Sequence, residues 1–194
     1  MGVIKSALEI ALEKTEKVKG DKSSINQFEA KQRGKKLANA YMAGEVDLAG
    51  EVKKAAANDR ESLKQGIFDV LVTQIALPSS KEDEERVEKL GKGLSVIIKS
   101  PEFPVMFNQL TQLFSQYIQE SAHYEQMIRQ QYAPKQKQKE EELSRRLGRE
   151  VRIDPLQDPE FIAFYNQHIG ALKGNYEPVI EQAKEEAKRM FEAK

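Results

Sequence analysis

The fold is decided by residues 100–132, which read SPEFPVMFNQLTQLFSQYIQESAHYEQMIRQQY. Ser100 and Pro101 are typical of a helix start, because serine caps the first turn and proline has no N–H to lose there. Large apolar side chains then recur at spacings of three and four residues, or seven, at Phe103, Phe107, Leu110, Phe114, Tyr117, Tyr124 and Ile128. That spacing places them on one stripe of a single helix. The sequence therefore predicts one long central helix that is buried along one side.

Amphipathic stripes outside this stretch predict further helices on both sides of it. We expect helices over residues 4–18, 24–43, 47–77, 80–100 and 159–191. Asp47 and Asp158-Pro159 mark expected starts, Gly20-Asp21, Gly44 and Pro78 mark expected ends, and Asn58-Asp59 marks an expected break. Ile25 and Phe28 are expected to lie on the inner face of the helix over residues 24–43. Gly170, Gly174 and Pro178 are expected to kink or split the last helix. The predicted fold is all-α, an elongated multi-helix bundle around one long central helix.

The chain length favours one domain over residues 1–194. Within it, Pro134 is expected to end the central helix, and residues 134–158 to form a charged helix and an extended connector before the C-terminal helix. Residues 150–154 alternate like a strand, but one strand without a partner forms no sheet, so we interpret them as extended connector.

Two helix openings resemble each other at an offset of 58 residues, Pro101-Glu102-Phe103 and Pro159-Glu160-Phe161. One interpretation is an internal repeat of stacked helical pairs, in which Asn108 and Asn166 would be equivalent. The other is that capping physics favours the same opening twice, since the residues between the matches do not agree. Both interpretations stay open at this point.

Composition excludes several classes of function. Lys and Arg together number 31, as do Asp and Glu, so the formal net charge is +0, whereas nucleic-acid-binding domains are usually basic. Cysteine is absent, which excludes disulfides, thiol nucleophiles and thiolate metal sites. No run of about 18 apolar residues occurs, so no membrane span is expected. A cysteine-free chain is compatible with the cytoplasm and also with a periplasm, and we expect a cytoplasmic protein.

Two local basic segments leave nucleic-acid binding as an alternative. The first covers residues 13–36, with eight basic and four acidic residues; the second covers residues 135–152, with seven and four. The candidate contacts under this alternative are Lys31, Arg33, Lys35, Lys36, Lys135, Lys137, Lys139, Arg145 and Arg146. Solvated helix faces with i,i+4 ion pairs explain the same residues, and we favour that explanation.

Candidate chemistry is sparse. Glu120 and His123 have the i,i+3 spacing of a helical metal-binding pair, but a di-iron bundle needs a second pair, and Tyr165 stands where its carboxylate would be. No nucleophile elbow or phosphate-binding loop occurs. We therefore expect no enzyme, no catalytic residue, no cofactor and no metal ligand.

The stretch from Ile4 to Thr15, IKSALEIALEKT, resembles the start of an uncharacterised family of small all-helical bacterial proteins. That resemblance implies a bacterial cytoplasmic protein and assigns no site residues. The apolar stripes exceed what one domain of this size easily buries, so we expect a non-enzymatic protein that acts through protein–protein contacts, as a homo-oligomer or with a partner protein. A nucleic-acid-associated helical protein is the alternative, and a metal- or ligand-binding bundle comes third.

Overall fold

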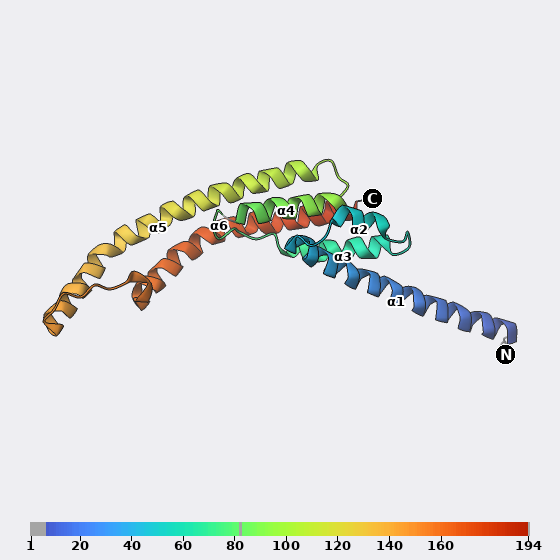
Figure 1. Ribbon diagram of the computed structural model, residues 1–194, viewed down its shortest axis with the longest axis horizontal. Coiled ribbons are helices and arrows are strands. Elements are labelled where there is room, and N and C mark those ends of the chain that lie inside the picture. The colour runs from blue at the N-terminus through green and yellow to red at the C-terminus, as the bar shows by residue number, and fades with distance from the viewer. Residues whose placement is uncertain (1–6, 82, 194) are drawn as a thin grey trace, which may run out of the picture. The chain divides into compact units, whose positions relative to one another are not determined.

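Helices joined by short connections, with no strand, make up the part of the chain that the computed structural model describes. That part is the backbone of residues 7–81 and 83–193 and the side chains of residues 24–81 and 83–193. The elements in order are α1 Ala7–Ala43, α2 Leu48–Lys54, α3 Arg60–Thr73, α4 Asp83–Ile97, α5 Phe103–Leu147, the 3-10 helix η1 Pro155–Gln157 and α6 Pro159–Glu192 (Figure 1). The prediction of an all-α fold with one long central helix is confirmed.

The long helix α5 extends further than predicted, because it continues through Pro134 to Leu147. A proline inside a helix removes one backbone hydrogen bond, at a cost of about 3 kcal/mol. Pro134 is exposed, so its ring meets no neighbouring helix and water can reach the freed carbonyl. The charged helix expected after Pro134 is therefore the C-terminal part of α5. Residues 150–154 are extended without strand pairing, as expected.

The predicted apolar stripe of α5 is buried except at Tyr124, which is 37% exposed. Burial instead continues from Tyr117 to Ile128 and Tyr132, which are 4%, 2% and 4% exposed. These positions advance by about 3.7 residues per turn, slightly more than the 3.5 of a left-handed coiled coil, so the buried face moves past Tyr124, which lies seven residues after Tyr117. Ser121 and Glu125, which are both half-buried, lie on this face between Tyr117 and Ile128.

The first helix α1 is one helix where the sequence predicted two. Gly20 and Asp21 lower helix propensity by up to about 1 kcal/mol each, which does not break a long helix. The predicted apolar stripe from Ile4 to Val18 lies outside the described side chains. The predicted end at Gly44 is confirmed: this residue has φ +85°, and the N–H of Glu45 donates to the carbonyl of Ala40 at 2.9 Å.

The predicted break near Asn58-Asp59 is also confirmed, since α2 ends at Lys54 and α3 begins at Arg60. Asp47 caps α2 as expected, and its carboxylate accepts the N–H groups of Ala49 and Gly50 at 3.1 Å. The guanidinium of Arg60 donates to the carbonyl of Ala55 at 3.0 Å and so closes the loop between α2 and α3.

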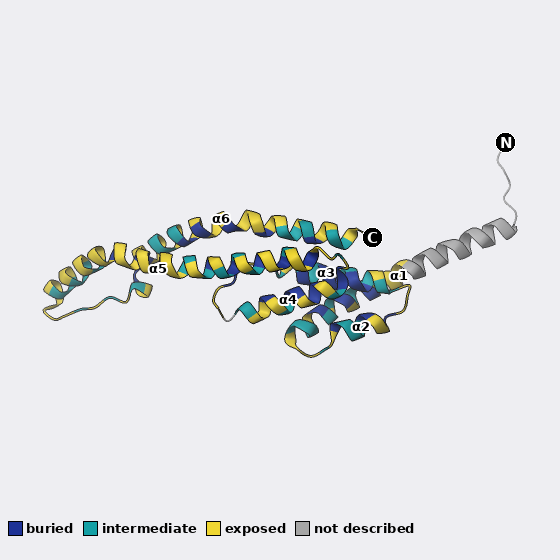
Figure 2. Ribbon diagram, turned by 90° about the horizontal axis from the view of Figure 1, so that it is seen from above, coloured by how far each residue is buried: buried dark blue, intermediate teal, exposed yellow. Residues whose placement is uncertain are grey.

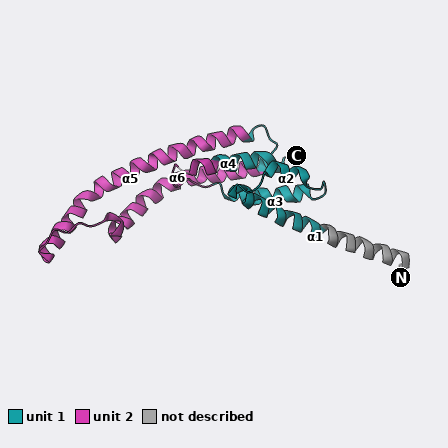
Figure 3. Cartoon of the chain, in the orientation of Figure 1, with its two compact units in different colours: residues 1–75, 88–103, 189–194 teal, residues 76–87, 104–188 magenta. Residues whose placement is uncertain are grey.

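Contacts divide the chain into two compact units (Figure 3). Unit 1 comprises residues 1–75, 88–103 and 189–194, and unit 2 comprises residues 76–87 and 104–188. The expectation of a single domain stays a prediction.

In unit 1, α1 and α3 cross very closely at two glycines, Gly34 and Gly66. A Cβ atom on Gly34 would overlap the carbonyl oxygen of Leu63, and one on Gly66 would overlap that of Lys31. Glycine is therefore required here by the approach of two backbones. Phe68 on α3 stacks on Phe191, with ring centroids 4.4 Å apart, which adds the last turn of α6 to this core.

In unit 2, α5 and α6 run side by side in opposite directions (Figure 1). The rings of Tyr132 and Phe161 lie 5.2 Å apart near one end, and those of Tyr117 and Tyr176 lie 5.1 Å apart further along. Both pairs have edge-to-face geometry, which aromatic quadrupoles favour.

The last helix α6 is continuous through Gly170, Gly174 and Pro178, so the expected split is absent. Gly170 and Gly174 are exposed, neither has positive φ, and a Cβ on either would meet nothing within 4 Å. Neither glycine is therefore required by packing or by backbone conformation.

Alanine at both positions is expected to stabilise the protein by about 1–2 kcal/mol in total, because glycine loses more backbone entropy in a helix. The measurement is the midpoint of urea unfolding for the Gly170→Ala, Gly174→Ala double variant. A midpoint at or below that of the unchanged protein would contradict the open surroundings of these two residues.

Candidate functional site

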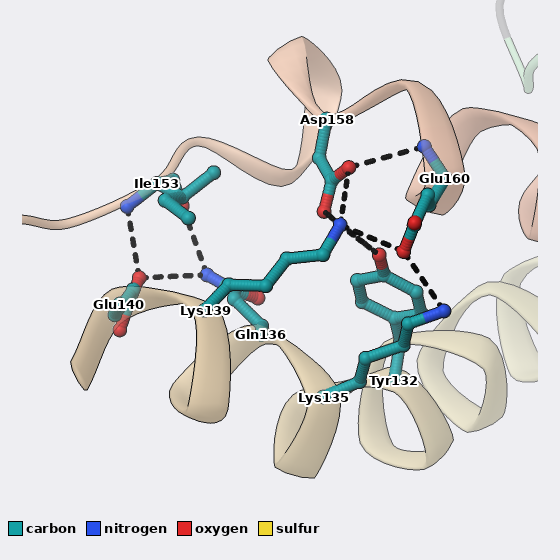
Figure 4. A network of polar contacts seen from close by, with 8 residues as sticks. All are labelled: Tyr132, Lys135, Gln136, Lys139, Glu140, Ile153, Asp158 and Glu160. Atoms are coloured by element: carbon teal, nitrogen blue, oxygen red, sulfur yellow. Dashed lines mark hydrogen bonds and ion pairs between the residues drawn. The ribbon is translucent and has the colours of Figure 1, made fainter. Parts of the chain in front are cut away.

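The buried carboxylate of Asp158 lies at the centre of a network of polar contacts (Figure 4). Its side chain is 6% exposed and sits where the connector meets α6. The Nζ of Lys139 donates to both of its oxygens at 2.8 Å, and the hydroxyl of Tyr132 donates to Oδ2 at 2.7 Å. The N–H of Glu160 donates to Oδ1 at 3.0 Å, so Asp158 also caps α6.

Two further ion pairs complete this network. The carboxylate of Glu160 lies 2.9 Å from the Nζ of Lys139 and 2.8 Å from that of Lys135. The network therefore joins two turns of α5 to the first turn of α6 (Figure 4).

Protonation in this network is fixed by its geometry. The hydrogen bonds from Lys139 lower the pKa of Asp158 to about 2, although burial opposes that shift. Hydrogen bonds to Asp158 and Glu160 raise the pKa of Lys139. Burial raises the pKa of Tyr132, and its bond to Asp158 adds to that effect. A protonated lysine and a neutral tyrosine are poor nucleophiles. Because these contacts join α5 to the first turn of α6, we call the network the polar clasp.

A second set of polar contacts fixes the connector along α5. The N–H of Ile153 donates to the carboxylate of Glu140 at 2.9 Å, and the amide of Gln136 donates to the carbonyl of Ile153 at 2.9 Å (Figure 4). The N–H of Val151 donates to the hydroxyl of Ser144 at 2.9 Å. The bond from Ile153 lowers the pKa of Glu140.

Two open grooves flank the connector. The larger has a volume of about 840 Å³ and includes Lys137 and Arg145 in its lining, beside Glu141 and Glu150. The smaller, of about 360 Å³, includes Lys139 and Arg146 beside Glu142. Both grooves are lined by both signs of charge, so neither is a uniformly basic surface.

The candidate nucleic-acid contacts divide between the two units. On α1, Lys31 pairs with Asp69 at 2.8 Å, Lys35 is half-buried, and Arg33 and Lys36 are exposed. On α5, Lys135 pairs with Glu160, and Lys139 pairs with both Asp158 and Glu160. Both carboxylates lie beyond the basic segment 135–152. Nucleic-acid binding stays a prediction.

The carboxylate of Glu120 is engaged by a tyrosine. It accepts the hydroxyl of Tyr176 at 2.6 Å, which lowers its pKa, while His123 is exposed. In the same way, Glu125 accepts the hydroxyl of Tyr165 at 2.6 Å. Burial is the main cause that raises the pKa of Tyr165 and of Tyr176 to about 12, and these hydrogen bonds are the second cause.

Among the described residues, no group of three or more His, Cys, Asp or Glu could hold a metal ion.

An exposed apolar stretch lies on α1, in unit 1. All six residues from Ser24 to Glu29 are exposed (Figure 2). Ile25 is 55% exposed and Phe28 is 63% exposed. The prediction that both side chains lie inside the helix bundle is wrong. Their neighbours Ala30, Gly34 and Ala38 are buried.

The fold and these sites define an all-α protein with a polar clasp between two antiparallel helices and an exposed apolar stretch on a third. Within the described residues, no helix has both the length and the apolar character that crossing a membrane requires. The chain belongs to a family of unknown function, DUF6657, whose match covers residues 49–189. Searches of curated proteins and of solved structures found no match. The expectation of an uncharacterised family is thereby confirmed.

Proposed function

We propose that this protein is a non-enzymatic, cytoplasmic, self-associating interaction protein that docks through the exposed stretch of α1. The observation that carries the proposal is the exposure of Ile25 and Phe28 within six consecutive exposed helical residues. Two large apolar side chains one turn apart form a contiguous patch on a helix, and such patches mark interaction surfaces.

Helix energetics support the same proposal. A helix that contacts no other part of its chain is marginal in water, because packing of an amphipathic face supplies most helix stability in proteins. Residues 24–29 are helical and all six are exposed, so this part of α1 receives little packing from the described residues. A partner that covers Ile25 and Phe28 would supply the missing packing.

The test is the mass of the full-length chain in solution, measured by sedimentation equilibrium. We expect a dimer at micromolar concentration, and we expect the Ile25→Glu, Phe28→Glu double variant to bind itself at least about tenfold more weakly, since two buried apolar side chains are lost. A monomer at high micromolar concentration for the unchanged chain would overturn the proposal.

The matched control is Val105→Glu. Val105 lies on α5 and is 61% exposed, so one glutamate, half of the charge that the double variant adds, is placed at a comparably exposed apolar residue. We expect its self-association to equal that of the unchanged chain. Equal weakening by Val105→Glu would show that added charge, and not loss of the α1 surface, separates the copies.

A further inference from the structure

We propose that residues 150–154 of the connector pair with the same residues of a second copy, as two antiparallel strands related by a two-fold axis at Val151. This inference goes beyond the proposed function, because it concerns a surface of unit 2 that does not include α1. The occupant of this surface is the connector of another copy, which supplies the strand partner that these extended residues lack.

The first observation is that α5 holds the connector in a strand-like conformation. The N–H of Val151 donates to Ser144 at 2.9 Å. The N–H and the carbonyl of Ile153 bond to Glu140 and Gln136, both at 2.9 Å (Figure 4). The three α5 residues are spaced by four, a rise of about 6 Å, which is close to the rise of about 6.7 Å over two residues of a strand. The helix therefore bonds to one edge of the connector much as a neighbouring strand would.

The second observation is that the opposite edge of the connector has no partner. In an extended chain, successive residues direct their N–H and C=O groups to opposite sides. Because Val151 and Ile153 direct theirs toward α5, Glu150 and Arg152 direct theirs away from it. Among the described residues, no group bonds to the backbone N–H or C=O of Glu150 or Arg152. An unpaired edge of this kind is a template for pairing with another chain.

The third observation is the alternation of charge on this segment. The Nε of Arg152 donates to the carboxylate of Glu150 at 3.3 Å, so both side chains lie on one face of the segment, and both residues are exposed. In an antiparallel pair centred on Val151, Glu150 of each copy lies opposite Arg152 of the other. These two residues of each copy then exchange backbone hydrogen bonds and form an ion pair across the strands.

Other alignments of the same two edges are less favourable. A parallel pair places the Glu150 and Arg152 side chains of the two copies on opposite faces, where no ion pair forms between them. An antiparallel pair centred on Arg152 sets two arginines opposite each other, which destabilises a strand pair. It also requires the carbonyl of Asp154, which already accepts the N–H of Gln157 at 2.9 Å. Charge and free hydrogen-bonding groups thus favour the alignment centred on Val151.

A disulfide can trap this alignment, because the chain contains no other cysteine. The two-fold axis sets Val151 opposite its own copy in a non-hydrogen-bonded pair, with Cα atoms about 4.5 Å apart, a separation that a disulfide bridges. We expect the full-length Val151→Cys variant, oxidised with glutathione disulfide, to form a covalent dimer on a non-reducing gel. A chain that stays monomeric would overturn the inference and leave the free edge to an extended segment of another protein.

The matched control is Ile153→Cys. Ile153 is the other half-buried apolar residue of the segment, so its thiol has similar exposure. In the proposed alignment the two copies of this residue lie roughly 14 Å apart along the strands. We therefore expect about tenfold less covalent dimer than with Val151→Cys, because a disulfide cannot span that separation. Equal yields from the two variants would show random collision and overturn the alignment.

Charge exchange provides an independent test in the Val151→Cys chain. We expect Glu150→Arg to lower the cross-linked fraction about tenfold, because both facing pairs become arginine opposite arginine. Arg152→Glu should act alike. Combining Glu150→Arg with Arg152→Glu should restore cross-linking, since the facing residues are again opposite in charge. A combined variant as weak as either single variant would overturn the inference.

The outcomes also distinguish this inference from the proposed function. Val151→Cys should still cross-link when Ile25→Glu and Phe28→Glu are added, because the connector contact does not use α1. Loss of the cross-link in that variant would overturn the connector as a separate surface. If Val151→Cys fails to cross-link while the unchanged chain sediments as a dimer, only this inference is wrong. Circular dichroism of each variant establishes that the helices are retained.

Discussion

Replacing either Gly34 or Gly66 by alanine is expected to destabilise the protein by about 3 kcal/mol. An added Cβ would overlap a backbone carbonyl of the facing helix in both cases, that of Leu63 or that of Lys31. A side chain could rotate away, but a carbonyl within a helix can move only with its whole helix. The measurement is urea unfolding followed by circular dichroism.

The control for this prediction is the alanine substitution at Gly170 and Gly174, which has the same chemistry and the opposite expected sign. Those two glycines have nothing within 4 Å of a Cβ. If Gly34→Ala left the free energy of unfolding unchanged, α1 and α3 would not be in contact at that residue, and the architecture of unit 1 would be wrong.

The second large effect is expected at Asp158. Replacing this residue by alanine should lower the free energy of unfolding by about 3 kcal/mol. The change removes the acceptor of Lys139 and Tyr132 and the cap of α6 together. Asp158→Asn should cost less, because asparagine also caps helices but lacks the charge. Equal stability of Asp158→Ala and the unchanged protein would contradict the network.

The pH dependence of stability isolates the charge of Asp158. Its pKa is about 2 in the folded protein, against an ordinary value of 3.8. Because the folded-state pKa is the lower one, this carboxylate contributes fully above about pH 4, and the contribution disappears as the pH falls toward about 2. The difference in free energy of unfolding between the unchanged protein and Asp158→Asn should shrink over that interval. A difference independent of pH would show that the charge contributes nothing.

Most of the fold could be predicted from the sequence because helix periodicity and caps are local signals. Gly44, Asp47 and the Asp158-Pro159 opening all act where expected. The errors fall at Gly20-Asp21, Pro134 and Pro178, where a residue unfavourable to helices lies inside one. A local penalty of about 1–3 kcal/mol predicts a break, but in a long helix the neighbouring turns outweigh it.

The resemblance between the two Pro-Glu-Phe openings has a partial explanation in the structure. The hydroxyl of Ser100 accepts the N–H of Glu102 at 3.2 Å, as Asp158 accepts that of Glu160 at 3.0 Å. Phe103 and Phe161 are both fully buried. Shared capping and burial account for the shared residues, and the internal repeat stays one of the two open interpretations.

The clasp around Asp158 could not be predicted from the sequence, because its partners come from segments far apart in the chain. Lys139 and Tyr132 lie on α5, and nothing in the spacing of charges identifies which acid each lysine meets. One local signal existed: Asp158 before Pro159 predicts a capping carboxylate. The exposure of Ile25 and Phe28 could not be predicted either. An apolar stripe predicts that a helix face is buried, but it does not identify whether the same chain or another molecule buries it.

The two tyrosine–glutamate hydrogen bonds between α5 and α6 have a consequence for the axial register of unit 2. Tyr165 meets Glu125 and Tyr176 meets Glu120, so one displacement along the axis satisfies both bonds. A slip of one helical turn, about 5.4 Å, would leave two carboxylates without donors beside apolar side chains. Apolar contacts alone tolerate such slippage, whereas these polar pairs penalise every alignment but the native one.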